Sequence, residues 1–331
     1  MDVTTQTQEP GAPVPGRRTI ALNPTRTDRV YRGTALGAGL LTLVILVLIG
    51  FFLFLKAWPA FHQMGFAFFT TQAWPATFGP TSRFGIGALL YWTVVIATIA
   101  LVFAVPVSIA TALFLTEYAP LGIRRPLTSL IDLLAAVPSL IYGLWGFFFL
   151  QPRMIGLTSW LSRHLSFIPI FRVSTSNFKS SAFIAGTVVA LMVVPICTSV
   201  MREVFSQAPP SEKEGALALG ATRWGMIRAV VLPFGVGGIV GGSMLGLGRA
   251  LGETIAIAII ISPIFVISPH ILQSGANSIA AHIALRFGEA TGLGLSALMA
   301  AGLALFLFTL LVNTLASIIV SRSRSGKGVE I

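Results

Sequence analysis

The sequence predicts an all-α integral membrane protein that has six transmembrane helices. Of its 331 residues, 55% are hydrophobic and 10% are charged, whereas soluble domains carry about 25% charged residues. The mean hydropathy is +0.86. A helix needs about 20 apolar residues to cross a bilayer, and runs of that length occur near residues 34–55, 88–116, 127–150, 182–201, 231–262 and 294–320.

Two short tails flank the apolar part of the chain. Residues 1–30 are rich in Thr, Gln, Pro and Gly and contain few large apolar side chains, so they cannot bury enough surface to fold. We therefore expect a disordered tail there, a transmembrane domain over residues 31–321 and a second tail over residues 322–331. The first apolar run is too long, and lies too far from the N-terminus, for a cleaved signal peptide. It is expected to remain as the first span.

Three prolines, Pro106, Pro138 and Pro195, interrupt predicted spans. A proline removes one backbone N–H and kinks a helix, and neighbouring helices support such kinks within membranes. We expect kinks at these positions and assign the prolines no chemical role.

The distribution of lysine and arginine predicts the orientation. Counted over alternate loops, one side of the membrane carries 14 of these residues and the other carries 7. The richer side is expected to be cytoplasmic, which places both termini and the loop 203–230 in the cytoplasm. The outer loops include residues 151–180, with four cations and no acid. They would attract an anion or, equally, contact lipid headgroups.

The stretch 211–233, which overlaps the loop 203–230, is the longest polar interruption in the apolar half of the chain. Ser211 and Glu214 have the spacing of a capping box, which predicts that a helix begins there. Gly220 is placed to end this helix, because glycine adopts the left-handed conformation without strain. A second short helix is expected to follow, with one apolar stripe formed by Trp224, Ile227 and Val231.

This region resembles the cytoplasmic loop signature of bacterial ABC importer permeases, E-A-A-x3-G-x9-I-x-L-P. Gly215 replaces the usual alanine and Val230 the usual isoleucine. In that family, whose fold is the type I importer permease fold, the loop docks into a groove of the ATP-hydrolysing subunit. The resemblance implies this coupling role for Glu214, Gly215, Ala216, Gly220, Leu232 and Pro233. The alternative is an ordinary loop with a capped helix.

The fifth predicted span contains many glycines and two opposite charges. Gly238, Gly242 and Gly246 form a ridge that allows another helix backbone to approach closely. Arg249 and Glu253 are four residues apart, so they would share one helix face and lie close enough to pair. A charge at the membrane centre costs at least about 2.5–3.5 kcal/mol, so such residues usually face a bundle interior or an aqueous pathway. Asp132, in the third span, is a weaker case of the same kind.

The motif around these charges, GRALGET, resembles the fifth-span motif of PstC-type phosphate permeases, and the similarity covers about residues 28–320. It implies a multi-pass subunit of an ATP-driven phosphate importer in a bacterial inner membrane, with Arg249 and Glu253 in the translocation pathway. The implied partners are a PstA-type second permease, a PstB-type ATP-binding dimer and a PstS-type extracytoplasmic phosphate-binding protein. A purely structural ion pair between Arg249 and Glu253 is the alternative.

Other functions are weighed against this one. From the charges alone the substrate is an anion, so a molybdate or sulfate permease is the nearest competitor. A self-contained secondary anion transporter would not need the docking signature. A membrane enzyme is disfavoured because the chain lacks H-E-x-x-H and G-x-S-x-G motifs. It also lacks G-x-x-x-x-G-K-[ST], so ATP is expected on a separate subunit. We expect no catalytic residue, metal site or cofactor in this chain.

Overall fold

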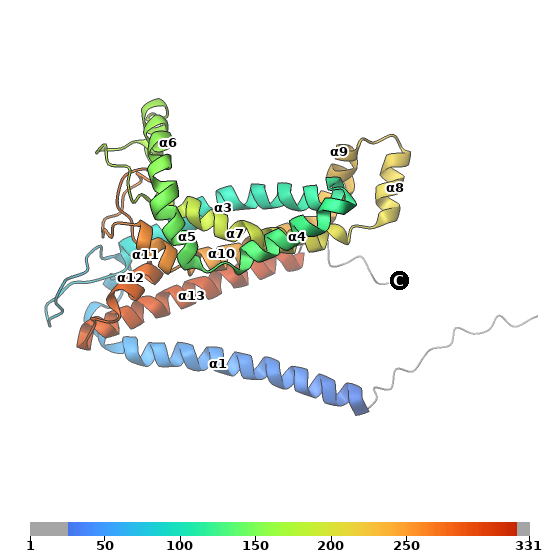
Figure 1. The fold of residues 1–331 in the computed structure, drawn as a ribbon. Coiled ribbons are helices and arrows are strands. Elements are labelled where there is room, and N and C mark those ends of the chain that lie inside the picture. The colour runs from blue at the N-terminus through green and yellow to red at the C-terminus, as the bar shows by residue number, and fades with distance from the viewer. Residues whose placement is uncertain (1–25, 323–331) are drawn as a thin grey trace, which may run out of the picture. The chain divides into compact units, whose positions relative to one another are not determined.

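A computed structural model describes residues 26–322, with side chains from residue 26 to residue 318. Most of both predicted tails, residues 1–25 and 323–331, therefore lies outside the described residues. For residues 26–30 the prediction of a disordered tail is wrong, because helix α1 begins at Arg26. The chain divides into two units after Ile49. Helix α1 (Arg26–Met64) runs from the first unit into the second, which contains the other elements (Figure 1).

Every regular element between residues 26 and 322 is helical. Five helices are long and apolar enough to cross a membrane, and they overlap five of the six predicted spans. They are α1, α3 (Gly87–Leu113) with the π-helical turn η1 (Phe114–Tyr118), α7 (Ala182–Ser206), α9 (Arg223–Met226) continued through the π-helical turn η4 (Ile227–Val231) into α10 (Leu232–Leu251), and α13 (Gly292–Arg322). A sixth span exists only if a sharply bent helix pair is counted as one.

The predicted third span, residues 127–150, is broken rather than kinked. Helix α4 (Leu121–Ala136) ends before Pro138, and the chain then turns by 91° into the segment 139–164 (Figure 1). Because a proline disfavours helical geometry in the residue before it, Val137 adopts an extended conformation. The second segment contains α5 (Ser139–Trp145), the π-helical turn η2 (Gly146–Leu150) and α6 (Gln151–His164).

The other two prolines behave differently. Pro106 and Pro195 lie inside the continuous helices α3 and α7. Both of these helices are packed into the core of the second unit, where neighbouring helices can support the backbone at the prolines.

The core of the second unit forms where α3, α7 and α10 pack together. A side chain on Gly238 would collide with Val204, and one on Gly246 would collide with Cys197 and Val193, all on α7. Gly242 faces the same helix at the backbone of Cys197. The ridge of small residues therefore lets α10 approach α7, which confirms the packing role predicted from the sequence.

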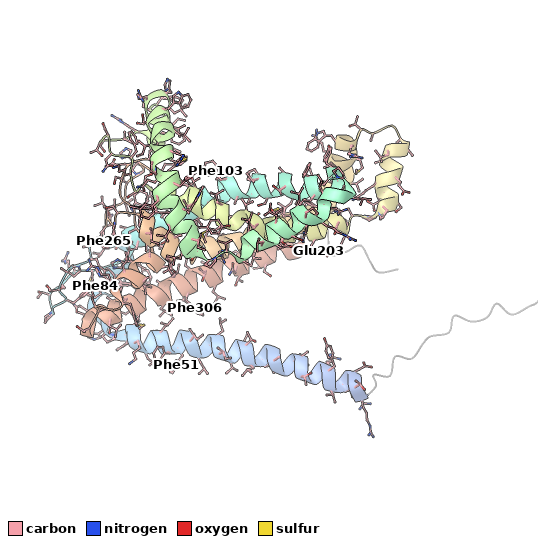
Figure 2. All side chains as sticks on the ribbon, viewed as in Figure 1. Phe51, Phe84, Phe103, Glu203, Phe265 and Phe306 are labelled. Atoms are coloured by element: carbon pink, nitrogen blue, oxygen red, sulfur yellow. The ribbon has the colours of Figure 1, made fainter. Side chains whose placement is uncertain are left out.

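A second apolar cluster lies at the end of this unit opposite α8 (Pro210–Ala218) and α9 (Figure 1). Figure 2 shows Phe84 and Phe265 at this end. Here His282, from α12 (Ile279–Arg286), packs edge-on against Trp74 and Phe265. Burial lowers the pKa of His282 to about 4, and the nearby Arg286 acts in the same direction. The imidazole is therefore neutral at pH 7.

The short elements α2 (Ala67–Thr70) and η3 (Pro169–Phe171) complete the described helices of this unit apart from α11.

The glycine ridge gives a stability prediction. Gly246→Leu is expected to lower the free energy of unfolding by about 1–3 kcal/mol, the usual cost of overpacking. An added Cβ would lie 2.6 Å from Cys197 Sγ and Val193 Cγ1. Gly241→Leu is the matched control, because nothing lies within 4 Å of its added Cβ. Denaturant unfolding in detergent measures both variants, and equal losses would contradict the packing role.

Candidate functional site

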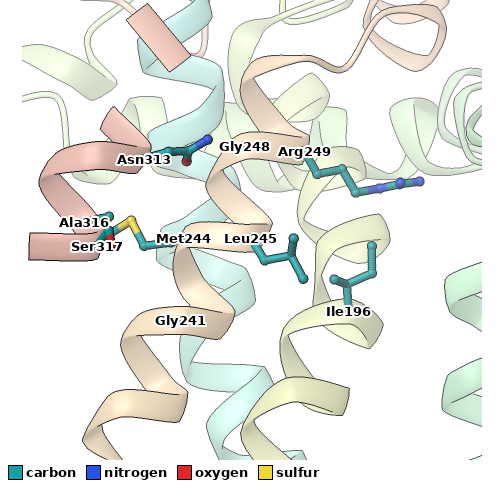
Figure 3. Close-up of a pocket in the computed structure, with 9 residues that line it drawn as sticks. All are labelled: Ile196, Gly241, Met244, Leu245, Gly248, Arg249, Asn313, Ala316 and Ser317. Carbon is teal, nitrogen blue, oxygen red and sulfur yellow. The ribbon is translucent and has the colours of Figure 1, made fainter. Parts of the chain in front are cut away.

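A cavity of about 570 Å³ lies between α7, α10 and α13. One face of α10 supplies most of its lining, and the glycines on that face leave the space open. Arg249 is the charged residue of the lining, while Asn313 and Ser317 on α13 add polar groups. Figure 3 shows the lining residues Ile196, Gly241, Met244, Leu245, Gly248, Arg249, Asn313, Ala316 and Ser317.

Arg249 lies close to the end of α10. In Figure 3 its side chain extends from α10 on the side away from Asn313. Its Nε is buried and has no hydrogen-bond partner among the described residues. An arginine whose Nε has no hydrogen-bonded partner retains its capacity to bind an anion.

The predicted fifth span, residues 231–262, is not one continuous helix. Helix α10 ends at Leu251, and the short helix α11 (Ile255–Ile260) begins after a three-residue break. Glu253 lies in this break, where its buried carboxylate accepts a hydrogen bond from the Ala256 N–H at 3.1 Å. A carboxylate next to the first turn of a helix satisfies an N–H that would otherwise be unpaired. This interaction stabilises a new helix start at the expense of continuing α10.

The expected pairing of Arg249 with Glu253 is therefore wrong in its geometry. The two residues do not share a continuous helix, and they form none of the salt bridges found among residues 26–318. Glu253 acts instead on the backbone of α11. The structure brings Arg249 to the cavity and places Glu253 in the break beyond it.

The breaks in the third and fifth spans lie against each other. Helices α5 and α11, which follow the breaks, pack together. An added Cβ on Gly143 of α5 would lie 2.8 Å from the Ala256 Cα of α11. Across the first break, the Tyr142 hydroxyl donates a hydrogen bond to the Leu134 carbonyl at 3.0 Å. Non-helical backbone at membrane depth occurs where protein or an aqueous cavity surrounds it, and beside each break here a side chain bonds to a backbone group.

Asp132 is not part of this arrangement. Its side chain is 49% exposed and lies 3.9 Å from Arg202. It also accepts a hydrogen bond from the Ser199 hydroxyl at 2.9 Å. Because Ser199 and Arg202 both lie on α7, Asp132 connects α4 to α7, and it is not a buried pathway charge as the sequence had indicated.

The predicted docking loop forms the helix α8 followed by a turn. Gly220 has φ +85°, its N–H donates to the Leu217 carbonyl at 2.9 Å, and the Ala221 N–H donates to the Ala216 carbonyl at 3.1 Å. This pair of bonds is a Schellman motif, which confirms the predicted helix end at Gly220. The expected capping box is wrong, because α8 begins at Pro210 and has no side-chain cap. Proline is pre-organised for the first helical position.

The second helix of the loop is longer than predicted. Thr222 caps α9 by accepting the Gly225 N–H at 3.1 Å, and the chain continues through η4 into α10 without a break. Of the predicted stripe, Ile227 and Val231 are buried, but Trp224 is 56% exposed.

The signature residues consequently fall into two places. Glu214, Gly215, Ala216 and Gly220 lie on α8 and its turn, and Leu232 and Pro233 lie in the first turn of α10. The loop also presents the exposed apolar side chains of Leu217, Leu219 and Trp224. Leu217 and Leu219 were not among the predicted docking residues, although large apolar residues in a polar loop are the signal of a contact surface.

A family model described as "Binding-protein-dependent transport system inner membrane component" matches residues 104–325. The chain belongs to this family. Its relatives include the "Phosphate transport system permease protein PstC 2" of Mycobacterium tuberculosis, which is 39% identical over 304 residues, covering 91% of this chain and 94% of the relative. The "Phosphate transport system permease protein PstC" of Haemophilus influenzae is 40% identical over 309 residues, covering 92% and 97%.

Solved structures of similar fold are permease chains of alginate transporters. A bacterial ABC transporter involved in alginate import gives a TM-score of 0.55 at 22% identity, covering 90% of this chain and 99% of that chain. A bacterial alginate ABC transporter in complex with an alginate pentasaccharide-bound periplasmic protein gives 0.59 at 20% identity, covering 91% and 98%. These similarities support the importer permease fold.

The capping role of Glu253 gives a second stability prediction. Glu253→Ala is expected to destabilise the protein by about 1 kcal/mol, because the Ala256 N–H loses its acceptor. Glu253→Gln is the matched control, since its amide oxygen can accept the same bond. Thermal unfolding of the purified protein measures both. Should the glutamine variant lose as much stability as the alanine variant, the charge of Glu253 would matter more than its capping bond.

Proposed function

We propose that this chain is the membrane permease subunit of an ATP-driven phosphate importer. The observation that carries the proposal is the lone arginine at the cavity, in a chain that is 39–40% identical over nine-tenths of its length to permeases named for phosphate transport. The chain would form half of the translocation pathway and perform no covalent step, with ATP hydrolysed on a separate subunit.

Arg249 is proposed to provide the positive potential for the passing anion. A guanidinium binds a phosphate oxyanion through two parallel charge-assisted hydrogen bonds, and its Nε is not already used by another described residue. Asn313 and Ser317 line the same cavity and supply uncharged hydrogen-bonding groups. Glu253 is proposed to contribute to the pathway by stabilising the break that ends α10 close to Arg249.

The docking loop is proposed to couple the chain to its motor. Leu217, Leu219 and Trp224 project from the loop around Gly220, and a partner that covers them would bury apolar surface. The proposed partners are a PstB-type ATP-binding dimer at this loop, a PstA-type permease beside this chain and a PstS-type binding protein on the outer side. The bacterial inner membrane is the location of the family.

Two alternatives follow from the chemistry of the site. A single guanidinium distinguishes poorly among tetrahedral oxyanions, so sulfate and molybdate remain the competing substrates. A self-contained secondary anion transporter is disfavoured, because the chain belongs to a family of binding-protein-dependent systems.

Substitution of Arg249 tests the pathway role. Arg249→Gln is expected to reduce uptake of radiolabelled phosphate by about 10- to 100-fold, the equivalent of one hydrogen bond to a charged group. Arg249→Lys should restore part of the rate, since it keeps the charge but loses the planar fork. Proteoliposomes with the complete transporter provide the assay, with competing sulfate and molybdate to identify the substrate. Unchanged uptake by an assembled Arg249→Gln complex would show that the arginine serves the scaffold.

Substitution of Gly220 tests the docking role. Gly220→Val should disrupt the turn, because a residue with a side chain costs about 1–2 kcal/mol in the left-handed conformation. The expected result is loss of copurification with the ATP-binding subunit, or loss of ATP-coupled uptake. Glu212→Val on the same loop is the control, because Glu212 is exposed in the first turn of α8 and lies outside the signature. Equal behaviour of the two variants would refute a specific need for the turn.

Surface labelling tests the orientation. Cysteines placed at Arg124 and Glu212 should react with an impermeant thiol reagent only from the cytoplasmic side. A cysteine at Arg172 should react only from outside. Labelling of either of the first two positions in intact cells would reverse the orientation and the site of docking.

A further inference from the structure

The docking loop makes a charged contact with an element far from it in the sequence. Lys213 on α8 places its Nζ 2.7 Å from Glu117 Oε1 in η1, at the end of α3. The side chains of Glu117 and Lys213 are 8% and 20% exposed, so the ion pair is largely withdrawn from solvent. Removing one member of such a pair leaves the other charge without compensation.

A second contact joins η1 to the other helix of the loop. The guanidinium of Arg223, at the start of α9, lies 5.5 Å from the centre of the Tyr118 ring. Glu117 and Tyr118 are consecutive residues of η1, so this one turn contacts both helices of the loop. π-helical turns often occur at functional sites in helices.

The position of α8 explains why these contacts matter mechanically. Helix α8 contains no fully buried residue, and it contacts α9 and η4, which continue into α10. A displacement of α8 reaches α10 directly along the chain. Through Glu117 it also reaches α3, which packs against α7 and α10 in the core. The ion pair thus provides a second connection from the loop to the helices that surround the cavity.

We propose that the Glu117–Lys213 ion pair transmits the movement of the docking loop to α3, so that both residues are positioning residues for ATP-coupled transport. This inference rests on the proposed docking function. The pair does not form the docking surface itself, because both of its side chains are largely withdrawn from solvent, whereas Leu217, Leu219 and Trp224 are exposed. Its loss should therefore separate ATP hydrolysis from transport while leaving docking intact.

The experiment compares four variants of the complete transporter in proteoliposomes. They are Glu117→Gln, Lys213→Met, the charge exchange Glu117→Lys with Lys213→Glu, and the control Glu212→Gln on the exposed first turn of α8. For each, copurification of the ATP-binding subunit, ATP hydrolysis and phosphate uptake are measured. We expect the two single variants to remain assembled and to hydrolyse ATP, but to import at least about 10-fold less phosphate per ATP. The charge exchange should recover much of this ratio, and the control should retain it.

A purely structural role predicts a different result. The single variants would then yield less folded complex with a lower unfolding temperature, while the folded fraction would keep the original ratio of uptake to hydrolysis. That outcome, or a charge exchange that recovers none of the lost ratio in an assembled complex, would overturn the proposal. If single substitutions prevent folding, Glu117→Ala with Lys213→Ala removes the contact without leaving an unpaired charge. This variant should assemble and remain uncoupled.

A substrate-independent readout separates this inference from the proposed function. Ser317 lines the cavity, and the ATP-dependent change in the labelling rate of a cysteine placed there reports movement around the cavity without any anion. If the unsubstituted transporter shows this change but imports no phosphate, the proposed substrate is wrong and the ion pair is still tested. The change should be lost in Glu117→Gln and kept in Glu212→Gln. Retention in both would overturn the proposal.

Discussion

Within a membrane every backbone N–H and C=O needs a partner inside the protein or in an aqueous cavity, and the structure of this chain depends on how it meets that constraint at two helix breaks. At the first break, the Tyr142 hydroxyl donates to the Leu134 carbonyl. At the second, the Glu253 carboxylate accepts the Ala256 N–H. The helices beyond the breaks pack together because Gly143 allows close approach of Ala256. These two bonds satisfy one backbone group beside each break.

The same constraint separates two charges that would otherwise neutralise each other. With Glu253 engaged by the backbone of α11, Arg249 remains at the cavity with its Nε unpaired among the described residues. An arginine paired to a carboxylate would bind an anion more weakly, because the carboxylate competes for the same N–H donors. The break thus has an electrostatic consequence as well as a geometric one. The break explains why Glu253, although it is four residues from Arg249, leaves the guanidinium available to bind an anion.

The sequence predicted the parts of this account that depend on local pattern. Apolar length identified five of the spans, the glycine ridge predicted the close approach of a neighbouring helix, and Gly220 predicted the end of α8. It did not predict the break at Gly252–Thr254, because helical spacing alone treats Arg249 and Glu253 as neighbours. Nor did it find the ion pair between Glu117 and Lys213, which are 96 residues apart, since such contacts depend on tertiary packing. Pro138 carried a signal for a break, but the same residue type leaves α3 and α7 continuous.

A double-mutant cycle on stability tests the separation of Arg249 from Glu253 most directly. The free energy of unfolding is measured for the original protein, for Arg249→Gln, for Glu253→Gln and for the combination. Glutamine at position 253 retains the capping acceptor, so the cycle reports the interaction of the two charges alone. The account predicts additive effects, to within about 0.5 kcal/mol, as for residues that share no partner. A coupling energy of about 1 kcal/mol or more would show that the two charges pair after all, and would contradict an arginine left free for the anion.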